Sequence, residues 1–387
     1  MGKKRLLVTA STFPRWNGDT EPRFVLDLCI GLNKYFDVTV LVPMCPNAKE
    51  EEYLEGVHVI RYHYFPIHKW ETLCYPGAIV PRIKEKKIRI FLVPFLFLGL
   101  ILKLFKILPQ YDYAHAHWII PQAIIQSFFK KKYIVTGHGA DVVSMNKGIM
   151  LPLKRRALKN ATDITVVSQH LENVVKSIYP LARTHIIPMG CWTSNFNSKY
   201  RKENYFHQNG KTVILFVGRL AEKKGVTYLI QAMNNVDAKL VIVGSGPLEN
   251  QLHMQAKTLG DKIEFLGSKT HEQLKEIYAS ADIFVAPSIT AKDGDQEGFG
   301  LVILEAMASG LPVVASNSGG IVDIISNNKN GFLVEEKDVN ALSNILQRLS
   351  KDEKLREEYS LKSEESVKQW DYDTISKKYK NIIDNMD

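Results

Sequence analysis

The sequence predicts an α/β protein made of two doubly wound parallel sheets. Short runs of β-branched residues alternate with longer stretches of helical periodicity through the whole chain, as in right-handed βαβ units. This alternation occurs twice, and hydrophobic periodicity is lost between the two series. With 387 residues, 45% of them hydrophobic, the chain is long enough for two domains that each bury a core.

The first half is expected to form six strands with helices between most of them. Each expected strand is a short, largely apolar run. Pro22 suits the first turn of the first helix, because the N–H that proline lacks would have no helical partner there. The strands are expected at Leu6–Ala10, Val38–Val42, Val57–Arg61, Tyr113–Ala116, Ile134–Thr136 and Asp163–Val167.

The second half repeats the pattern. Helices such as Leu274–Ser280 and Leu301–Ser309 separate its strands, as in a second doubly wound sheet. The strands are expected at Val213–Val217, Leu240–Val243, Ile263–Leu266, Ile283–Ala286, Val313–Ala315 and Phe332–Val334.

An interdomain linker is expected at Asn195–Gly210, which gathers Asn, Ser, Lys and Gly. We therefore expect an N-terminal domain at 1–195, a C-terminal domain at 196–365 and a final helix within 366–387. Ligands of open α/β sheets bind outside the carboxyl ends of the strands. A cleft between two facing sheets is therefore the expected working site.

The formal net charge of +9 indicates an anionic partner, such as nucleic acid, an acidic membrane or a phosphorylated substrate. The sequence has no RNP-type aromatic motif, zinc finger or basic heptad helix, which argues against nucleic acid. Its four cysteines form no CxxC pair and suggest neither a zinc site nor a disulfide framework. A reducing cytosol is the expected location.

One segment, Ile90–Leu102, is almost wholly apolar. Pro94 and Gly99 interrupt it, and it is shorter than the roughly 20 residues that a membrane span needs, so we do not expect it to cross a bilayer. Basic residues flank it throughout Arg82–Lys106, so docking on an anionic membrane surface is favoured over burial in a core. The flanking cations are Arg82, Lys84, Lys86, Lys87, Arg89, Lys103 and Lys106.

The strongest chemical signal is a pair of carboxylates, Glu297 and Glu305, in EGFGLVILE. If both lie on one helix, eight residues make about 2.2 turns, and the carboxylates share nearly one face about 12 Å apart along the axis. They could then hold two ends of one ligand. The backbone N–H groups of Phe299, Gly300 and Leu301 would lie in the first turn, where the helix dipole favours an anion such as a diphosphate.

A second signal is the basic loop VGRLAEKKG, which carries Arg219, Lys223 and Lys224. Cations beside a helix N-terminus can neutralise the charge of a departing diphosphate without a metal, and arginine is the better bidentate donor. Each feature alone is more often a solvated charge. Their combination favours a site.

A metal is not expected. The D-x-D strings Asp293–Asp295 and Asp371–Asp373 lie where aspartate is common, in a glycine-containing loop and at a helix start. His115 and His117 face one side of a strand but have no third ligand nearby, so contact with an acceptor is favoured over zinc.

Five segments in the second half, in this order, resemble the family 4 retaining glycosyltransferases of GT-B fold. Four more in the first half resemble the family more thinly: TFPRWNGDTEPRFV, HAHWIIPQ, TGHGAD and VVSQHL. The final WDYDTISKKY resembles the last helix of the family, which returns to the first domain. The five segments are VGRLAEKKG, GSGP, FLGSKTHEQLKEIYASADIFVAPS, EGFGLVILEAMASGLPVVAS and SGGIVDII.

The resemblance implies two domains facing across a cleft, with the donor bound by the C-terminal domain and the acceptor by the N-terminal one. It implies that Arg219 and Lys224 bind the donor diphosphate and that Glu305 binds the ribose hydroxyls. Glu297, with the amides that follow it, would bind the transferred sugar. No cofactor is implied beyond the nucleotide diphosphate-sugar substrate.

In the first domain, His138 follows a strand and is expected to hydrogen-bond the donor sugar or its phosphate. His117 and Asp141 are candidates for the acceptor side, although Asp141 could simply cap the next helix. Gly18 lies in the first βα loop, where the family usually has a glycine pair close to the leaving phosphate. Here Asp19 replaces the second glycine, and its carboxylate would have to turn toward the acceptor or Arg23.

Together these features predict a retaining, metal-independent glycosyltransferase that moves a sugar onto a lipid-linked or membrane-surface saccharide in cell-envelope polysaccharide synthesis. The expected location is the cytoplasm, peripheral at the inner face of the cell membrane. Two alternatives remain. One is a nucleotide-sugar epimerase or phosphorylase of the same fold, and the other is a non-catalytic, membrane-associated nucleotide-sugar-binding protein.

Overall fold

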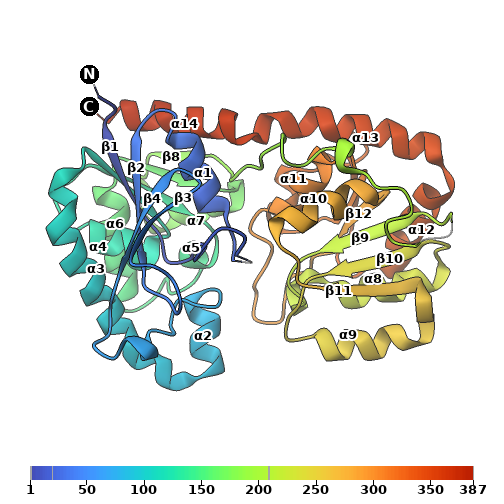
Figure 1. The fold of residues 1–387 in the computed structure, drawn as a ribbon, viewed down its shortest axis with the longest axis horizontal. Helices are drawn as coiled ribbons and strands as arrows, with labels where there is room; N and C mark the ends of the chain where they lie inside the picture. Colours follow the sequence, from blue (N-terminus) through green and yellow to red (C-terminus); the bar gives the residue numbers. More distant parts are fainter. Residues whose placement is uncertain (1, 20, 208–209, 387) are drawn as a thin grey trace. The chain divides into compact units, whose positions relative to one another are not determined.

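The computed structural model describes residues 2–19, 21–207 and 210–386 (Figure 1). The chain forms two compact units. Unit 1 comprises Met1–Met189 together with Tyr372–Asp387, and unit 2 comprises Gly190–Asp371. The division therefore falls a few residues before the expected boundary at 195, and the segment that returns to unit 1 begins at Tyr372 rather than at residue 366.

Unit 1 is built on an eight-stranded sheet in the order β3-β4-β2-β1-β5-β6-β7-β8. All pairs are parallel except β3–β4. Without its edge strands β3 and β8, which were not predicted, the order is that of a doubly wound dinucleotide-type sheet. The strands are β1 Arg5–Thr9, β2 Asp37–Pro43, β3 Glu51–Leu54, β4 Val57–Tyr62, β5 Tyr113–His117, β6 Tyr133–Gly137, β7 Asp163–Val166 and β8 Thr184–Ile186.

The helices of unit 1 include one from the end of the chain. Helix α14 packs on α1 so closely that a Cβ added to Gly31 would lie 2.8 Å from Ser376. The Tyr379 hydroxyl of α14 lies 3.3 Å from the hydroxyls of Thr136 and Thr165 in the sheet. The helices are α1 Phe24–Leu32, α2 Ile79–Glu85, α3 Val93–Ile107, α4 Ile124–Gln126, α5 Ala140–Val143, α6 Met150–Asn160, α7 Gln169–Ile178 and α14 Tyr372–Asp384.

Unit 2 has a six-stranded parallel sheet in the order β11-β10-β9-β12-β13-β14, again doubly wound. All six of its strands were predicted, and the bounds of β9, β12 and β14 are the expected ones. The strands are β9 Val213–Val217, β10 Lys239–Val243, β11 Ile263–Gly267, β12 Ile283–Ala286, β13 Val313–Ser316 and β14 Phe332–Val334.

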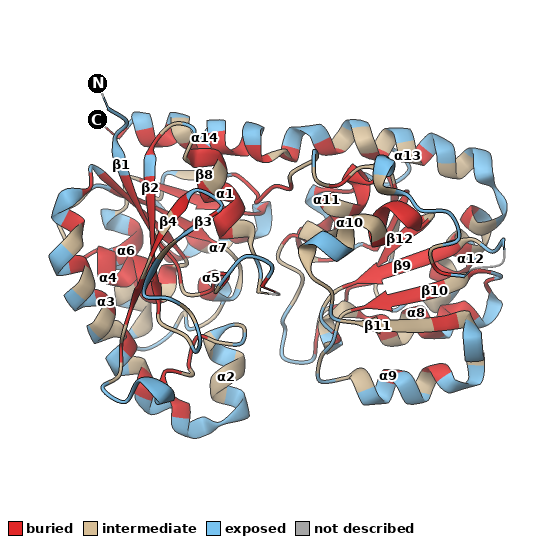
Figure 2. Cartoon of the chain, in the orientation of Figure 1, coloured by how far each residue is buried: buried red, intermediate tan, exposed pale blue. Residues whose placement is uncertain are grey.

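The helices of unit 2 begin at residues that suit helix starts. Thr270 and Gln273 form a capping box at α10, and the carboxylates of Asp338 and Asp352 cap α12 and α13. Strands β9, β10 and β12 are almost wholly buried, which explains their continuous apolar sequences (Figure 2). The helices are α8 Val226–Ala232, α9 Glu249–Ala256, α10 His271–Ser280, α11 Leu301–Ala308, α12 Val339–Lys351 and α13 Glu353–Val367.

Candidate active site

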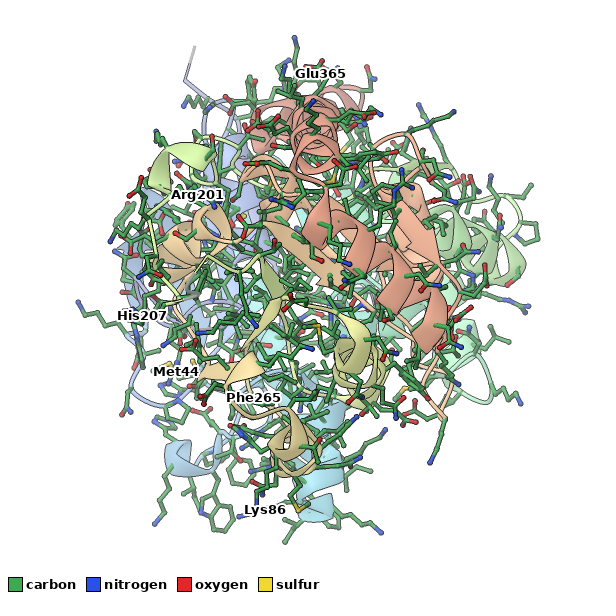
Figure 3. The ribbon with its side chains drawn as sticks, turned by 90° about the vertical axis from the view of Figure 1, so that its right-hand side faces the viewer. Met44, Lys86, Arg201, His207, Phe265 and Glu365 are labelled. Atoms are coloured by element: carbon green, nitrogen blue, oxygen red, sulfur yellow. The ribbon has the colours of Figure 1, made fainter. Side chains whose placement is uncertain are left out.

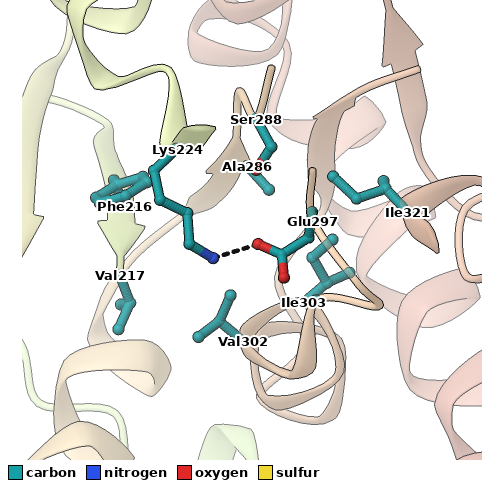
Figure 4. A pocket seen from close by; sticks show the side chains of 10 residues that line it. Phe216, Val217, Lys224, Ala286, Ser288, Glu297, Val302, Ile303 and Ile321 are labelled. Carbon is teal, nitrogen blue, oxygen red and sulfur yellow. Dashed lines mark hydrogen bonds and ion pairs between the residues drawn. The ribbon is translucent and has the colours of Figure 1, made fainter. Parts of the chain in front are cut away.

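A cavity of about 240 Å³, open to solvent, lies in unit 2 at the carboxyl ends of β9 and β12. These neighbouring strands are the point at which the strand order reverses, which is where open α/β sheets bind ligands. Lys224 and Glu297 bring charge to a largely apolar lining. The lining residues are Phe216, Val217, Lys224, Ala286, Ser288, Glu297, Gly300, Val302, Ile303 and Ile321 (Figure 4).

The central feature of this cavity is an ion pair between Lys224 Nζ and Glu297 Oε2 (Figure 4). The two side chains are only 16% and 14% exposed. Burial raises the pKa of Glu297, but the attraction of Lys224 and Lys223 outweighs burial and lowers it overall. Glu297 is therefore an anion that shares its charge with the cation predicted to bind a diphosphate.

Glycines bring the loops that carry this pair close to their neighbours. A Cβ on Gly225, next to Lys224, would lie 1.8 Å from the carbonyl oxygen of Pro287 at the end of β12. A Cβ on Gly320 would lie 2.1 Å from the carbonyl oxygen of Gly298, and the Gly320 N–H donates to the Glu297 carbonyl at 3.0 Å. Larger residues at either glycine would push the charged pair out of place.

The expected helix geometry of the two glutamates is wrong. Helix α11 begins at Leu301, and Gly300, with φ of 98°, is its N-cap, so Glu297 lies in the preceding loop. Only Glu305 is on the helix. Its Oε2 accepts a hydrogen bond of 2.8 Å from the Tyr278 hydroxyl, and its Oε1 lies 3.9 Å from His271 Nε2.

Two predicted anion-binding features are available in unit 2. Arg219 is exposed just after β9, and none of the described residues pairs with its guanidinium. The backbone N–H groups of Phe299, Gly300 and Leu301 likewise have no protein acceptor within residues 2–19, 21–207 and 210–386. Of these four residues, only Gly300 lines the cavity. Their diphosphate role stays a prediction.

In unit 1, His138 directly follows β6 and belongs to a cluster of histidines. Its Nε2 lies 2.9 Å from Nδ1 of His117, and their rings are stacked with centroids 5.1 Å apart. The ring of His115 contacts that of His117 in a tilted arrangement, with centroids 4.2 Å apart, and its Nε2 is hydrogen-bonded to the Thr136 hydroxyl at 2.7 Å. The ring of Phe24 also contacts that of His138, with centroids 5.1 Å apart.

The cluster is held in the neutral state. Burial lowers the pKa of His115 to about 3 and the pKa of His138 to about 3, and it lowers the pKa of His117 well below its usual value. His117 is completely buried, so its ring has no surface with which to contact an acceptor, contrary to expectation. It orients His138 instead, because the 2.9 Å hydrogen bond fixes one ring nitrogen of each.

Asp141 is buried and fully engaged by the backbone. Its carboxylate accepts hydrogen bonds from the N–H groups of Ile119, His138 and Gly139 at 2.8–3.1 Å. Burial raises its pKa overall, despite these bonds and the nearby Lys154. Asp141 does not cap the next helix, because it lies within α5, whose N-cap is Gly139. One of its oxygens holds the backbone of His138 and Gly139, and the other holds the backbone of Ile119.

Gly18 lies in a turn from Trp16 to Asp19, with φ of 80°. The Asp19 carboxylate turns neither toward Arg23 nor outward. It forms two hydrogen bonds of 2.9 Å with the guanidinium of Arg15 and accepts the Arg15 N–H. The charge that would repel a phosphate near Gly18 is therefore neutralised within its own loop, while Arg23 pairs with other carboxylates.

A second cavity, about 260 Å³ and open to solvent, lies in unit 1 near the carboxyl ends of β1, β2 and β4. Ser11 and Tyr75 offer it hydroxyl groups. The guanidinium of Arg61 is already bonded to Glu52 and to the carbonyls of Pro14 and Arg15. Its lining residues are Ser11, Phe13, Val42, Pro43, Cys45, Arg61, Cys74 and Tyr75.

Sequence reasoning missed the residues that hold the Glu297 loop. Glu336 accepts hydrogen bonds from the Thr290 N–H and hydroxyl at 2.8 and 2.9 Å. Lys223, expected in the phosphate clamp, instead pairs with Asp295 at 3.0 Å. No local sequence signal marks Glu336, since its partners Thr290 and Ser318 lie 46 and 18 residues away.

Each D-x-D string has an aspartate that pairs with a protein group. Asp295 forms an ion pair with Lys223, and Asp371 accepts hydrogen bonds from the N–H and hydroxyl of Thr193 at 3.0 and 2.6 Å. Across the described ranges, no group of three or more His, Cys, Asp or Glu side chains is arranged to hold a metal. Independence from metal stays a prediction.

Comparison with known proteins gives consistent results. Residues 22–194 match the family described as Glycosyltransferase Family 4, and residues 198–366 match Glycosyl transferases group 1. An uncharacterized glycosyltransferase of Methanocaldococcus jannaschii is 30% identical over 298 residues, which cover 70% of this chain and 75% of that protein.

A second relative is the GDP-mannose-dependent alpha-(1-6)-phosphatidylinositol monomannoside mannosyltransferase of Mycobacterium tuberculosis. It is 30% identical over 252 residues, which cover 60% of this chain and 66% of that protein. Among solved structures, sucrose-phosphate synthase from Thermosynechococcus elongatus superposes with a TM-score of 0.79 at 22% identity and covers 99% of both chains.

Proposed function

Because the chain belongs to the family 4 glycosyltransferases and has the GT-B fold, we propose that it is a retaining, metal-independent enzyme that transfers a sugar from a nucleoside diphosphate-sugar. The acceptor is a lipid-linked or membrane-surface saccharide, and the product enters a cell-envelope polysaccharide. The observation that carries the proposal is the Lys224–Glu297 pair in the cavity at the strand-order reversal of unit 2.

The donor chemistry follows from the charges around this cavity. When the bond from the sugar to the diphosphate breaks, negative charge develops on the leaving phosphate, and groups already aimed there lower the barrier. The guanidinium of Arg219, the ammonium of Lys224 and the amides of Phe299, Gly300 and Leu301 supply that stabilisation. Glu297, whose carboxylate pairs with Lys224, then accepts hydrogen bonds from the sugar hydroxyls.

Retention fits the engagement of the carboxylate that follows His138. Asp141 is the carboxylate nearest to it in sequence, and its two oxygens are taken by three backbone N–H groups. A carboxylate nucleophile is thus not offered from this loop. The acceptor hydroxyl therefore attacks from the face that the diphosphate leaves, and a departing phosphate oxygen takes its proton. His138, being neutral, positions the donor by hydrogen bonding.

The acceptor binds unit 1, where the hydroxyls of Ser11 and Tyr75 line a second cavity. A saccharide presents hydroxyl groups that such a site can pair. The relative from Mycobacterium tuberculosis is named for transfer from GDP-mannose to a phosphatidylinositol mannoside, which supports a lipid-linked acceptor here. On this proposal the enzyme works in the cytoplasm, at the inner face of the cell membrane.

The first test is thermal stabilisation by UDP, GDP, ADP and their sugars, with and without EDTA, on the unchanged protein and on Arg219→Ala and Glu305→Ala. One diphosphate should raise the unfolding midpoint equally with and without EDTA. Both variants should lose most of the shift, since one removes the phosphate cation and the other the ribose acceptor.

The stabilising nucleotide-sugar is then incubated with a lipid-linked saccharide, and the anomeric configuration of the product is read by NMR. An α-linked donor should give an α-linked product. Inversion of configuration, or stabilisation that depends on a divalent cation, would contradict the mechanism. No stabilisation by any nucleotide would contradict the proposed function itself.

A further inference from the structure

Helix α3 is fixed to unit 1 by one stripe of leucines. Leu92, Leu96, Leu100, Leu104 and Leu108 recur every four residues, and each is at least nine-tenths buried. Midway along the stripe, Gly99 lies against the backbone of residues 63 and 64, where a Cβ would meet atoms at 3.0 Å. The stripe therefore belongs to the folded core of unit 1.

The opposite side of the same helix is also apolar, although it faces out of the protein. At 100° per residue, positions 91, 95, 98, 102 and 105 form a stripe centred on the side opposite the leucines. Phe91 is 73% exposed, Leu102 is 56% exposed and Phe105 is 75% exposed. A helix that is apolar all round is normally covered on every side. We call this outward stripe, together with Ile88, the α3 surface.

Aromatic contacts extend the α3 surface onto a neighbouring loop. Phe95 meets the ring of Phe65 edge-on at 4.9 Å, and Phe65 stacks on Trp70 at 5.8 Å. Trp70 itself is 52% exposed. The exposed apolar side chains therefore form one patch across two segments, larger than isolated surface hydrophobes would give.

The rim of this patch is strongly basic. Residues 67–110 contain eight lysines and arginines but only two carboxylates, a net charge of +6 out of +9 for the chain. Both carboxylates are engaged locally: Glu71 is buried and hydrogen-bonded to His63 and to the backbone N–H of Phe65, and Glu85 pairs with Arg82 and Arg89. The exposed cations include Lys84, Lys86 and Lys87, and Figure 3 shows Lys86 at the outer edge of the ribbon.

From this combination we infer that the α3 surface is a docking site for an anionic lipid bilayer, in which α3 lies along the interface with its outward aromatic side chains among the acyl chains. The charge argues against a second copy of the chain as the partner of this surface, because two patches with a net charge of +6 would repel each other. The leucine stripe decides against a span. Lys87–Gln110 is long and apolar enough to cross a membrane, but crossing would pull the stripe out of unit 1.

This docking site rests on the proposed function, because its use is to bring the enzyme to a lipid-linked acceptor. Binding to vesicles requires no turnover, however, and stabilisation by a nucleotide requires no vesicle. Failure of docking and failure of the proposed function are therefore separate results.

The test is flotation of the full chain with vesicles of phosphatidylcholine alone or with about 30% phosphatidylglycerol. We expect binding to the anionic vesicles only, and release by high salt, as for basic interfacial helices. Phe91→Ser/Phe105→Ser should weaken this binding at least tenfold, because both rings leave water on docking. Because both side chains are exposed in the free protein, the thermal unfolding midpoint should not change.

Matched controls separate this patch from general surface properties. Leu181→Ser/Leu361→Ser removes two equally exposed apolar side chains elsewhere and should bind as the unchanged protein does. Lys84→Gln/Lys86→Gln/Lys87→Gln should lose at least tenfold, whereas Lys354→Gln/Lys377→Gln/Lys378→Gln should lose much less.

Three outcomes would overturn the docking site. The first is failure to bind anionic vesicles. This includes the case in which the chain instead forms a dimer in solution and Phe91→Ser/Phe105→Ser dissociates that dimer. The second is a bound fraction that resists both salt and alkaline carbonate, as a span would. The third is equal loss of binding in the test and control variants.

Discussion

At the scale of single residues, the Lys224–Glu297 pair is both the best-placed feature of the donor site and an obstacle to binding. A buried pair gains attraction at the cost of desolvating both charges. A diphosphate that approaches Lys224 must therefore compete with Glu297 for the same ammonium. Binding and transfer place opposite demands on this carboxylate.

The first prediction separates those demands. Glu297→Gln keeps the shape of the side chain but frees Lys224, so a nucleoside diphosphate should bind at least as tightly as before by calorimetry. Transfer should fall by about 100-fold or more, because a positioned charge near the reacting sugar is lost. Asp295→Asn, which removes a carboxylate from the same loop outside the cavity, is the control. Weaker nucleotide binding in Glu297→Gln would contradict the competition.

The second prediction concerns the neutral histidines. Their pKa is about 6.5 in the unfolded chain and about 3 for His115 and His138 in the folded one. Between these values the unfolded state binds more protons, so the free energy of unfolding falls as the pH drops below 6.5. Each such histidine contributes about 1.4 kcal/mol per pH unit to that fall.

Urea unfolding between pH 5 and 8 measures this slope. His115→Phe removes one of the three imidazoles and should reduce the slope below pH 6.5 by about a third, whatever it does to stability at pH 8. The exposed histidine in His68→Phe is the matched control and should leave the slope unchanged. Equal slopes in the unchanged protein and in His115→Phe would show that the buried imidazoles are not the cause.

At the scale of elements, helix α6 secures the loop after the His138 segment through a buried lysine. Lys154 is completely buried, and its ammonium donates to the carbonyls of Val142 and Ser144 at 2.8 and 3.0 Å and to Asn146 Oδ1. Burial lowers the pKa of Lys154 to about 8, only partly offset by Asp141. The helix thus positions the loop by charge rather than by apolar packing.

The third prediction follows from this contact. Lys154→Met preserves the length of the side chain but leaves three oxygens without their donor, so it should destabilise the protein by about 2–4 kcal/mol in urea unfolding. Hydrogen exchange should accelerate across residues 140–146. Lys159→Met changes an exposed lysine of the same helix and should alter neither quantity. Unchanged exchange in Lys154→Met would mean that the loop is held by other contacts.

Elements with strong local patterns could be predicted from the sequence, and those fixed by distant partners could not. The strands of unit 2 are continuous apolar runs, and all six were expected. Edge strand β3 has the polar sequence EEYL, and its pairing with β4 is accompanied by contact of Glu52 with Arg61, so no local pattern marks it. Glu297 was assigned to a helix because helical periodicity continues after it, whereas Gly300 starts the helix later.

The same distinction applies to the site. Lys224 and Glu297 line one cavity because the loops that carry them follow the adjacent strands β9 and β12, whereas Arg219 and Glu305, predicted from the same motifs, are not among its lining residues. Lys154 could have been noticed, because it shares a helix face with Ala157 and Leu158 at core spacing. The burial of His117 could not, because alternation along β5 shows which side a residue faces but not what covers it.

At the scale of the whole molecule, the two units differ in how the chain builds them. Unit 2 is continuous, from Gly190 to Asp371, and has its own six-stranded sheet and core. Unit 1 is not, because α14 supplies part of its core from the end of the chain. Tyr372, Ile375, Tyr379, Ile382 and Ile383 of that helix are all buried.

The fourth prediction tests this difference with a chain that ends at Asp371. Each buried apolar side chain contributes about 1.5–3 kcal/mol, so losing α14 removes on the order of 10 kcal/mol, comparable to the whole stability of a domain. Calorimetry should show that the unfolding transition of unit 1 disappears. The transition of unit 2 should remain, and the nucleoside diphosphate that stabilises the full chain should still shift it, because the cavity residues all belong to unit 2.

A chain that ends at Asp384 serves as the control, since it keeps the whole of α14 and should retain both transitions. Gly31→Val provides a second route to the same result, because its side chain would collide with Ser376 and displace α14 without shortening the chain. It should lower the transition of unit 1 alone. If the chain ending at Asp371 kept a cooperative unit 1, α14 would be an accessory helix. If truncation abolished the nucleotide response of unit 2, the donor site would depend on more than the continuous sequence that surrounds it.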